Sequence, residues 1–209
     1  MKKSSVIALA LCAITLVVVS AATYLLTQPG QGTDRPSGAV ATTVQIGGDF
    51  TLVNTEGETV TSADFDGLYR VMFFGFVHCP DFCPTKLYQI SQTLDRLPPE
   101  VVERIAPIFV TVDPARDTPE VLRDYLNTLD DRFEGLSGTE EQIAATAKAF
   151  RVYYQKAPSD DPDFYNVDHS TFTYVMDPQN RFIDVISYDT PIEAMVRKIG
   201  GYVESGATG

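Results

Sequence analysis

The most distinctive chemistry in this chain belongs to two cysteines, Cys79 and Cys83, that lie in one short segment. The segment reads HCPDFCP over positions 78–84 and directly follows the apolar run of residues 71–77. The whole protein has three cysteines and two histidines, so this segment holds a large share of its soft metal-binding side chains. Two thiolates and one imidazole form a ligand set that favours soft or borderline metals, Cu(I) above all.

The spacing of the two cysteines differs from that of a thioredoxin-type redox pair, in which two residues separate the sulfurs. Here three residues separate them, and Pro80 and Pro84 restrict the backbone on each side. The wider loop suits two sulfurs that converge on a small ion, and it also permits a disulfide. A purely structural disulfide is the alternative, although it would close a very short loop and so add little stability.

The two histidines differ as candidates for a third ligand. His78 is adjacent to Cys79, and neighbouring side chains diverge, so a surface role or a role outside the ligand set is favoured. His169 lies in YNVDHS, residues 165–170, just before a predicted strand. In a thioredoxin-like topology the loop entering that strand lies beside the cysteine loop, which makes His169 the candidate ligand; an ordinary loop or core histidine is the alternative. Asp168 could hold the imidazole tautomer, or could simply be a turn residue.

Hydrophobic periodicity predicts the elements that must position these residues. A continuous apolar strand precedes the cysteine segment, as in strands buried on both faces, and an amphipathic helix follows it. Thr118 with Pro119, and the capping box TEEQ at 139–142, predict two further helix starts. The expected elements are a hairpin at 50–53 and 58–60, strands at 68–77 and 105–112, helices at 85–97, 119–129 and 140–152, a second hairpin at 172–176 and 182–187, and a last helix that opens at 190–193.

This order of elements predicts an α/β protein of the thioredoxin-like class, with a central sheet flanked by helices and an N-terminal β-hairpin. The first long strand ends, and the first helix begins, at the cysteine segment. Sites in such sheets lie beyond the carboxyl ends of the strands, so the cysteines occupy a position where chemistry is expected.

The first 27 residues predict a membrane anchor. Residues 6–26 carry no charge, and a helix of about 20 apolar residues spans a bilayer. Lys2 and Lys3 precede them, which predicts a cytosolic N-terminus and an exported remainder. A cleavable signal peptide is the alternative. Residues 28–45, rich in Gly, Pro, Ser and Thr, predict a flexible linker, and residues 46–209 form the predicted domain.

The net charge of the chain is −12, which argues against binding to nucleic acid, because such binding depends on clustered Lys and Arg. The same charge argues against a polybasic contact with a membrane surface. No feature of the sequence indicates an obligate dimer, so we expect a monomer.

Three segments together resemble the Sco/SenC family: FGFVHCPDFCP at 74–84, VDPARDT at 112–118 and VDHS at 167–170. The resemblance covers about residues 46–204 and extends to the N-terminal anchor. It implies a membrane-tethered thioredoxin-like domain that binds one copper ion through Cys79, Cys83 and His169. It also implies a role in assembling the binuclear copper centre of cytochrome c oxidase subunit II.

The resemblance further implies a location and a set of partners. The expected location is the bacterial inner membrane, crossed once with the C-terminal domain in the periplasm, or the equivalent mitochondrial membrane. The expected partners are subunit II, a periplasmic copper donor and a thiol reductant, and copper is expected as Cu(I) and in some states as Cu(II).

Several alternatives stay open at the level of sequence. Cys79 and Cys83 could instead form the catalytic pair of a thiol-disulfide oxidoreductase that keeps the cysteines of its target reduced. A peroxiredoxin-like peroxidase is a weaker alternative. Zinc is the rival metal, because two thiolates and an imidazole also suit a zinc site with an open position. Asp113 could be a turn residue before a proline or a weak ligand for oxidised copper.

Overall fold

The structure is a computed structural model that describes residues 20, 23, 45–161 and 164–209. The folded domain is the unit of residues 44–209. The predicted anchor at 1–27 and linker at 28–45 therefore lie almost wholly outside the described residues. Within the described part of the chain, no helix is both long enough and apolar enough to cross a bilayer.

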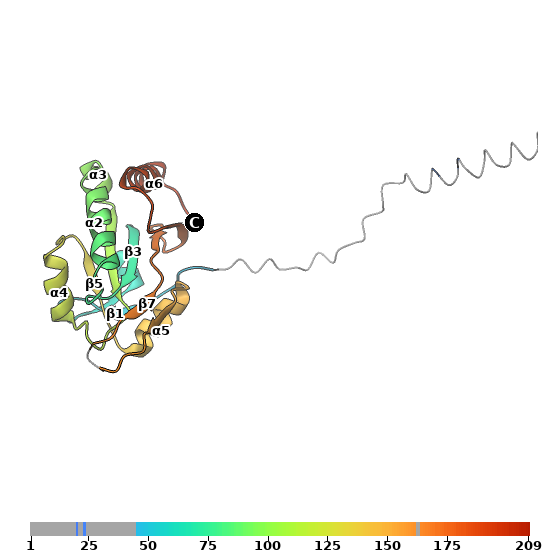
Figure 1. The fold of residues 1–209 in the computed structure, drawn as a ribbon. Coiled ribbons are helices and arrows are strands. Elements are labelled where there is room, and N and C mark those ends of the chain that lie inside the picture. Colours follow the sequence, from blue (N-terminus) through green and yellow to red (C-terminus); the bar gives the residue numbers. More distant parts are fainter. Residues whose placement is uncertain (1–19, 21–22, 24–44, 162–163) are drawn as a thin grey trace, which may run out of the picture. The chain divides into compact units, whose positions relative to one another are not determined.

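A mixed five-stranded sheet forms the centre of the domain (Figure 1). Its strand order is β5-β4-β3-β8-β9. β3, β4 and β5 are mutually parallel, whereas β8 and β9 run antiparallel to their neighbours. The bounds of these strands are β3 Tyr69–Gly75, β4 Ile105–Thr111, β5 Glu134–Leu136, β8 Thr173–Met176 and β9 Phe182–Ile186. The predicted α/β class with a central sheet is confirmed.

Every residue of β3 and β4 is buried, as the largely apolar sequence of both strands predicts. The charged exception is Arg70 of β3, which donates hydrogen bonds to Ser62 and Asp66. The two strands pair in register from Tyr69 with Ile105 to Gly75 with Thr111. Their carboxyl ends therefore lie side by side, and each is followed by one of the motif segments noted in the sequence.

Helices flank the sheet, and most begin where their caps predict. Thr118 accepts a hydrogen bond from the backbone N–H of Val121 at the start of α4, and Thr139 forms a capping box with Gln142 at the start of α5. α2 packs beside α6, and α4 packs against β5. The bounds are α2 Phe82–Leu94, α3 Pro99–Val102, α4 Pro119–Asn127, α5 Glu140–Ala149 and α6 Ile192–Ser205, with a 3-10 turn at Ser62–Phe65.

The helix after the cysteine segment begins three residues earlier than predicted, at Phe82 rather than at residue 85. Pro84 lies in its first turn, where a missing N–H costs nothing because such groups have no partner within the helix. The prediction that the helix starts after Pro84 was wrong, because a proline is tolerated in the first turn of a helix. The consequence is that Cys83 belongs to the helix N-terminus.

Two further pairs of strands lie outside the central sheet. The predicted N-terminal hairpin is confirmed as β1 Thr51–Val53 and β2 Thr59–Thr61. A second pair, β6 Tyr154–Lys156 and β7 Val167–His169, is absent from the sequence prediction, which expected a loop there. The register places Tyr154 opposite His169.

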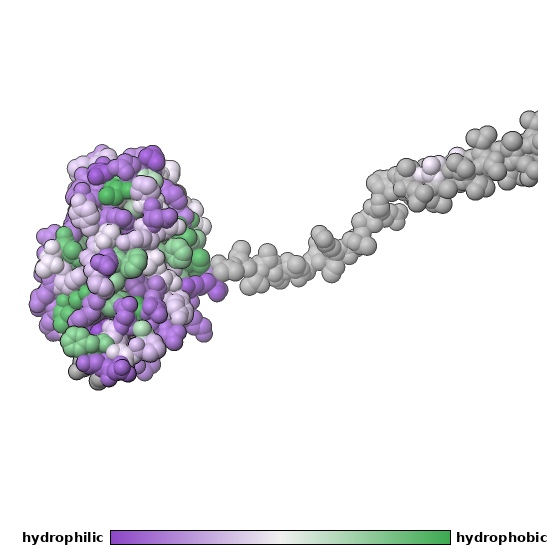
Figure 2. All heavy atoms as spheres, viewed as in Figure 1, coloured by the Kyte–Doolittle hydropathy of each residue, from purple (hydrophilic) through white to green (hydrophobic). Residues whose placement is uncertain are grey.

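The face of the domain in Figure 2 is largely hydrophilic, with separate apolar patches between the polar side chains. This distribution is expected for a folded domain, because part of the apolar surface always stays outside the core.

Candidate metal centre

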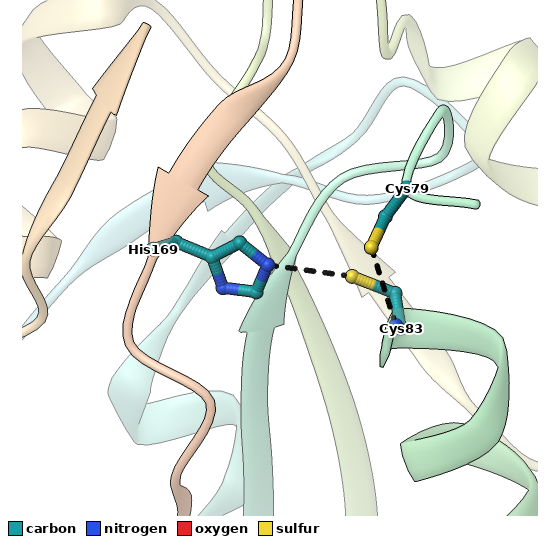
Figure 3. Close-up of side chains that lie close together, drawn as sticks. All are labelled: Cys79, Cys83 and His169. Carbon is teal, nitrogen blue, oxygen red and sulfur yellow. Dashed lines mark hydrogen bonds between the residues drawn. The ribbon is translucent and has the colours of Figure 1, made fainter. Parts of the chain in front are cut away.

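The two cysteines lie at the junction of β3 and α2, as the sequence predicts (Figure 3). Cys79 belongs to the connecting loop, and Cys83 is the second residue of α2. The backbone N–H of Cys83 donates a hydrogen bond to Cys79 Sγ over 3.4 Å. Both side chains are buried and both are free thiols. The two sulfurs therefore meet at a helix N-terminus, the setting that favours a thiolate.

His169, the last residue of β7, completes the group. Figure 3 shows its imidazole directed at the sulfur pair, with Nε2 3.5 Å from Cys83 Sγ. Nδ1 lies 2.9 Å from the backbone oxygen of Ser170, which fits an Nδ1–H that donates to this carbonyl. Nε2 then presents its lone pair to the sulfurs, the arrangement that metal-binding histidines use. One potential ligand atom from each of the three residues lies within 4.8 Å of the others.

Aromatic packing fixes the imidazole ring. The His169 ring makes T-shaped contacts with the ring of Phe76, at a centroid distance of 5.7 Å, and with that of Phe73, at 6.2 Å. Both phenylalanines are buried. The ring is therefore held by apolar contacts as well as by its hydrogen bond.

The pKa values of the two thiols are driven apart. The hydrogen bond from the Cys83 thiol lowers the pKa of Cys79 to about 4, despite the opposing effect of burial. The same hydrogen bond, together with burial, raises the pKa of Cys83 well above its usual range. In the metal-free reduced protein, this arrangement favours the thiolate at Cys79 and the protonated thiol at Cys83.

A cavity of about 340 Å³ opens next to this group. Its lining includes Cys79, Phe82, Asp168 and His169. Although the sulfurs are buried, an incoming small ligand or side chain can reach the site from this side.

Two other candidates from the sequence lie apart from the group. The imidazole of His78 is 52% exposed, and its Nδ1 lies 3.8 Å from a carboxylate oxygen of Asp117, which agrees with the expected role outside the ligand set. Asp168 is exposed. The tautomer-holding role considered for Asp168 is wrong, because the carbonyl of Ser170 occupies Nδ1.

Asp113 is buried, and both of its carboxylate oxygens are engaged by protein groups. Oδ1 accepts a hydrogen bond of 2.7 Å from the Tyr165 hydroxyl, and Oδ2 accepts one of 2.5 Å from Nε of Arg116. Neither alternative for Asp113, a turn residue or a weak ligand, anticipated these partners. Sequence reasoning missed Tyr165 altogether, because nothing local in the sequence pairs it with a carboxylate 52 positions away.

The fold and the site define a thioredoxin-like protein with a thiol–thiol–imidazole group at the end of its first parallel strand. The model of the SCO1/SenC family matches residues 38–204 of the chain. Protein sco1 of Schizosaccharomyces pombe is 38% identical over 203 residues, which cover 95% of this chain and 76% of that protein. The chain belongs to the SCO1/SenC family.

Solved structures agree with this assignment. Bradyrhizobium japonicum ScoI with copper bound is 37% identical, with a TM-score of 0.69 over 75% of this chain and 99% of that one. BsSco, described as a Sco family protein of cytochrome c oxidase assembly with a disulfide switch, has a TM-score of 0.59 over 77% of this chain and 95% of its own. At 19% identity, BsSco supports the fold alone.

Proposed function

We propose that this protein is a copper metallochaperone that holds one copper ion through Cys79, Cys83 and His169. The observation that carries the proposal is the convergence of two sulfurs and an imidazole nitrogen from segments 86 residues apart. The donor set favours Cu(I), and the similarity to copper-bound ScoI supports the same cargo.

The small number of protein ligands on the copper ion would allow its transfer to a target. Three protein ligands leave room for a fourth, and the cavity beside Cys79 and His169 gives access to it. A thiolate or imidazole of the target adds to the copper ion before one of the three donor ligands leaves, so the ion is never free. An external disulfide that accepts two electrons from the two thiolates, and is itself reduced to two thiols, would leave a Cys79–Cys83 disulfide. Both sulfur ligands would then be lost, which links copper loading to the redox state.

The proposed target is the binuclear copper centre of cytochrome c oxidase subunit II. Membership of the SCO1/SenC family supports it. We further propose that residues 1–27 tether the domain to the bacterial inner membrane, or its mitochondrial equivalent, as a monomer. A periplasmic copper donor and a thiol reductant would then supply the ion and keep the cysteines reduced.

A second function is favoured by the separated thiol pKa values. As a thiol-disulfide reductase, the Cys79 thiolate would attack a disulfide of the target and release one target thiolate. Cys83 would then lose its proton and attack the mixed disulfide, which frees the second target thiol and leaves a Cys79–Cys83 disulfide. This reaction needs both cysteines and does not need His169.

Competition with a Cu(I) chelator under reducing conditions tests the proposal. The proteins compared are the wild-type domain, Cys79→Ala, Cys83→Ala, His169→Ala and, as a matched histidine control, His78→Ala. We expect the first three variants to lose tight binding and His78→Ala to retain it. Wild-type affinity in His169→Ala would reject the metal-site assignment and leave the reductase, and preference for Zn²⁺ over Cu(I) in the same assay would reject copper.

A further inference from the structure

The segment DPARDT, residues 113–118, contains none of the three clustered ligand side chains, yet it connects the two parts of the site. It follows β4, whose carboxyl end lies beside that of β3. Its side chains and backbone form hydrogen bonds toward the strand that carries His169 and toward the loop that carries Cys79.

On the histidine side, the contact is made by Tyr165, four residues before His169. Its hydroxyl donates a 2.7 Å hydrogen bond to Asp113 Oδ1. Two cations also contact its ring, Arg116 at 3.6 Å from the centroid and Lys156 at 3.4 Å. Arg116 in turn donates from Nε to the other oxygen of Asp113. The tyrosine is thus fixed at its hydroxyl and over its ring.

On the cysteine side, the hydrogen bonds continue from the same aspartate. The backbone N–H of Asp113 donates to Thr111 Oγ1 over 2.9 Å, and Thr111 Oγ1 donates to Asp117 Oδ2 over 2.6 Å. The same Asp117 oxygen accepts from the backbone N–H of Val77 over 3.0 Å. Val77 lies two residues before Cys79. A continuous hydrogen-bonded path therefore runs from Tyr165 to the start of the cysteine loop.

β7, the strand that carries His169, is not paired with any strand of the central sheet. The hydrogen-bonded path therefore bears on where His169 lies. β6 and β7 pair with each other in a separate two-stranded sheet, and each has only three residues. Such a short isolated pair has little stability of its own. At its C-terminal end, β7 is connected to the central sheet through residues 170–172, which lead into β8. At its N-terminal end, side-chain contacts hold it, and the Tyr165–Asp113 bond lies two residues before β7.

We propose that Tyr165 is a positioning residue that holds His169 at copper-binding distance from Cys79 and Cys83, by anchoring β7 to Asp113. The proposal deepens the metallochaperone function and rests on it. Asp113 acts through Tyr165 and Arg116, and is not itself a ligand in this arrangement.

The test compares Tyr165→Phe with Tyr202→Phe. The control is closely matched, because Tyr202 also donates a 2.7 Å hydrogen bond to an aspartate, Asp184, at a place outside the site. Loss of a partner that orients a metal ligand typically lowers metal affinity about 10- to 100-fold. We expect a fall of that order in Cu(I) affinity for Tyr165→Phe, measured by chelator competition, and wild-type affinity for Tyr202→Phe.

A second comparison separates positioning from general destabilisation. In a His169→Ala background, Tyr165→Phe should cause no further loss of Cu(I) affinity, since the tyrosine acts only through the imidazole. Wild-type affinity in Tyr165→Phe, or an equal loss with and without His169, would overturn the proposal.

A measurement on the metal-free protein tests the positioning role of Tyr165 independently of copper binding. NMR of the reduced apo domain should show added exchange broadening of the His169 ring signals in Tyr165→Phe, with none in Tyr202→Phe. Failure of the wild-type domain to hold Cu(I) would reject the chaperone function, whereas a rigid His169 ring in apo Tyr165→Phe would reject the positioning role.

Discussion

Gly75 and Cys83 are in such close contact that no other residue fits at position 75 without displacing the sulfur. A Cβ atom on Gly75 would lie 2.7 Å from Cys83 Sγ and 3.0 Å from a ring carbon of Phe109. The last residue of β3 has no Cβ atom, which allows α2 to bring its thiol directly against the strand.

We therefore expect Gly75→Ala to damage copper binding. The added methyl group must push aside a buried thiol and a buried ring, and overpacking of this kind costs about 1–3 kcal/mol. Chelator competition should show weaker Cu(I) binding, and urea unfolding should show lower stability. Gly201→Ala in α6 is the control, because its Cβ would meet no atom within 4 Å. Equal copper affinity in the two variants would contradict the close contact.

The reduced metal-free protein should be alkylated selectively at Cys79. Only the thiolate is nucleophilic, and the pKa of Cys79 is lowered to about 4 while that of buried Cys83 is raised. The rate of reaction with iodoacetamide, followed by mass spectrometry, should be flat near neutral pH and fall as the pH drops through about 4. In Cys83→Ala, which lacks the donating thiol, the fall should move to higher pH. A wild-type profile that rises only near pH 9 would refute this assignment.

Copper should stabilise the reduced domain, because the folded three-ligand site binds it more tightly than the unfolded chain does. At free Cu(I) of about 1,000 times the Kd, one site adds about 4 kcal/mol to the free energy of unfolding. Thermal unfolding with and without Cu(I) should show a clear rise in Tm for the wild type and a smaller rise for His169→Ala. Prior oxidation of the two cysteines should abolish the rise. Equal shifts in the reduced and oxidised forms would place the copper elsewhere.

The parts of the fold that sequence predicts well are those with a strong local signal. β3 and β4 are largely apolar runs, and Thr118 and Thr139 mark helix starts by cap chemistry that needs only neighbouring residues. The sequence also predicts that the cysteine pair lies at a strand–helix junction, because the apolar run of residues 71–77 ends where the cysteine segment, residues 78–84, begins.

The features of the fold and site that could not be predicted depend on contacts between residues far apart in the sequence. β6 and β7 are three residues each, too short for a recognisable alternation, and their pairing joins Tyr154 to His169. The topology predicts that His169 lies near the sulfurs, but the distance and the orientation of the ring depend on contacts between segments far apart in the sequence. The bond between Tyr165 and Asp113 joins two buried or partly buried groups that no periodicity relates.

The most direct measurement of the central claim is X-ray absorption at the copper edge of the Cu(I)-loaded, reduced domain. We expect a first shell of two sulfur atoms and one imidazole nitrogen in the wild type, and loss of the nitrogen in His169→Ala with the sulfurs retained. A wild-type shell of two sulfurs without nitrogen, unchanged by His169→Ala, would contradict the three-ligand site.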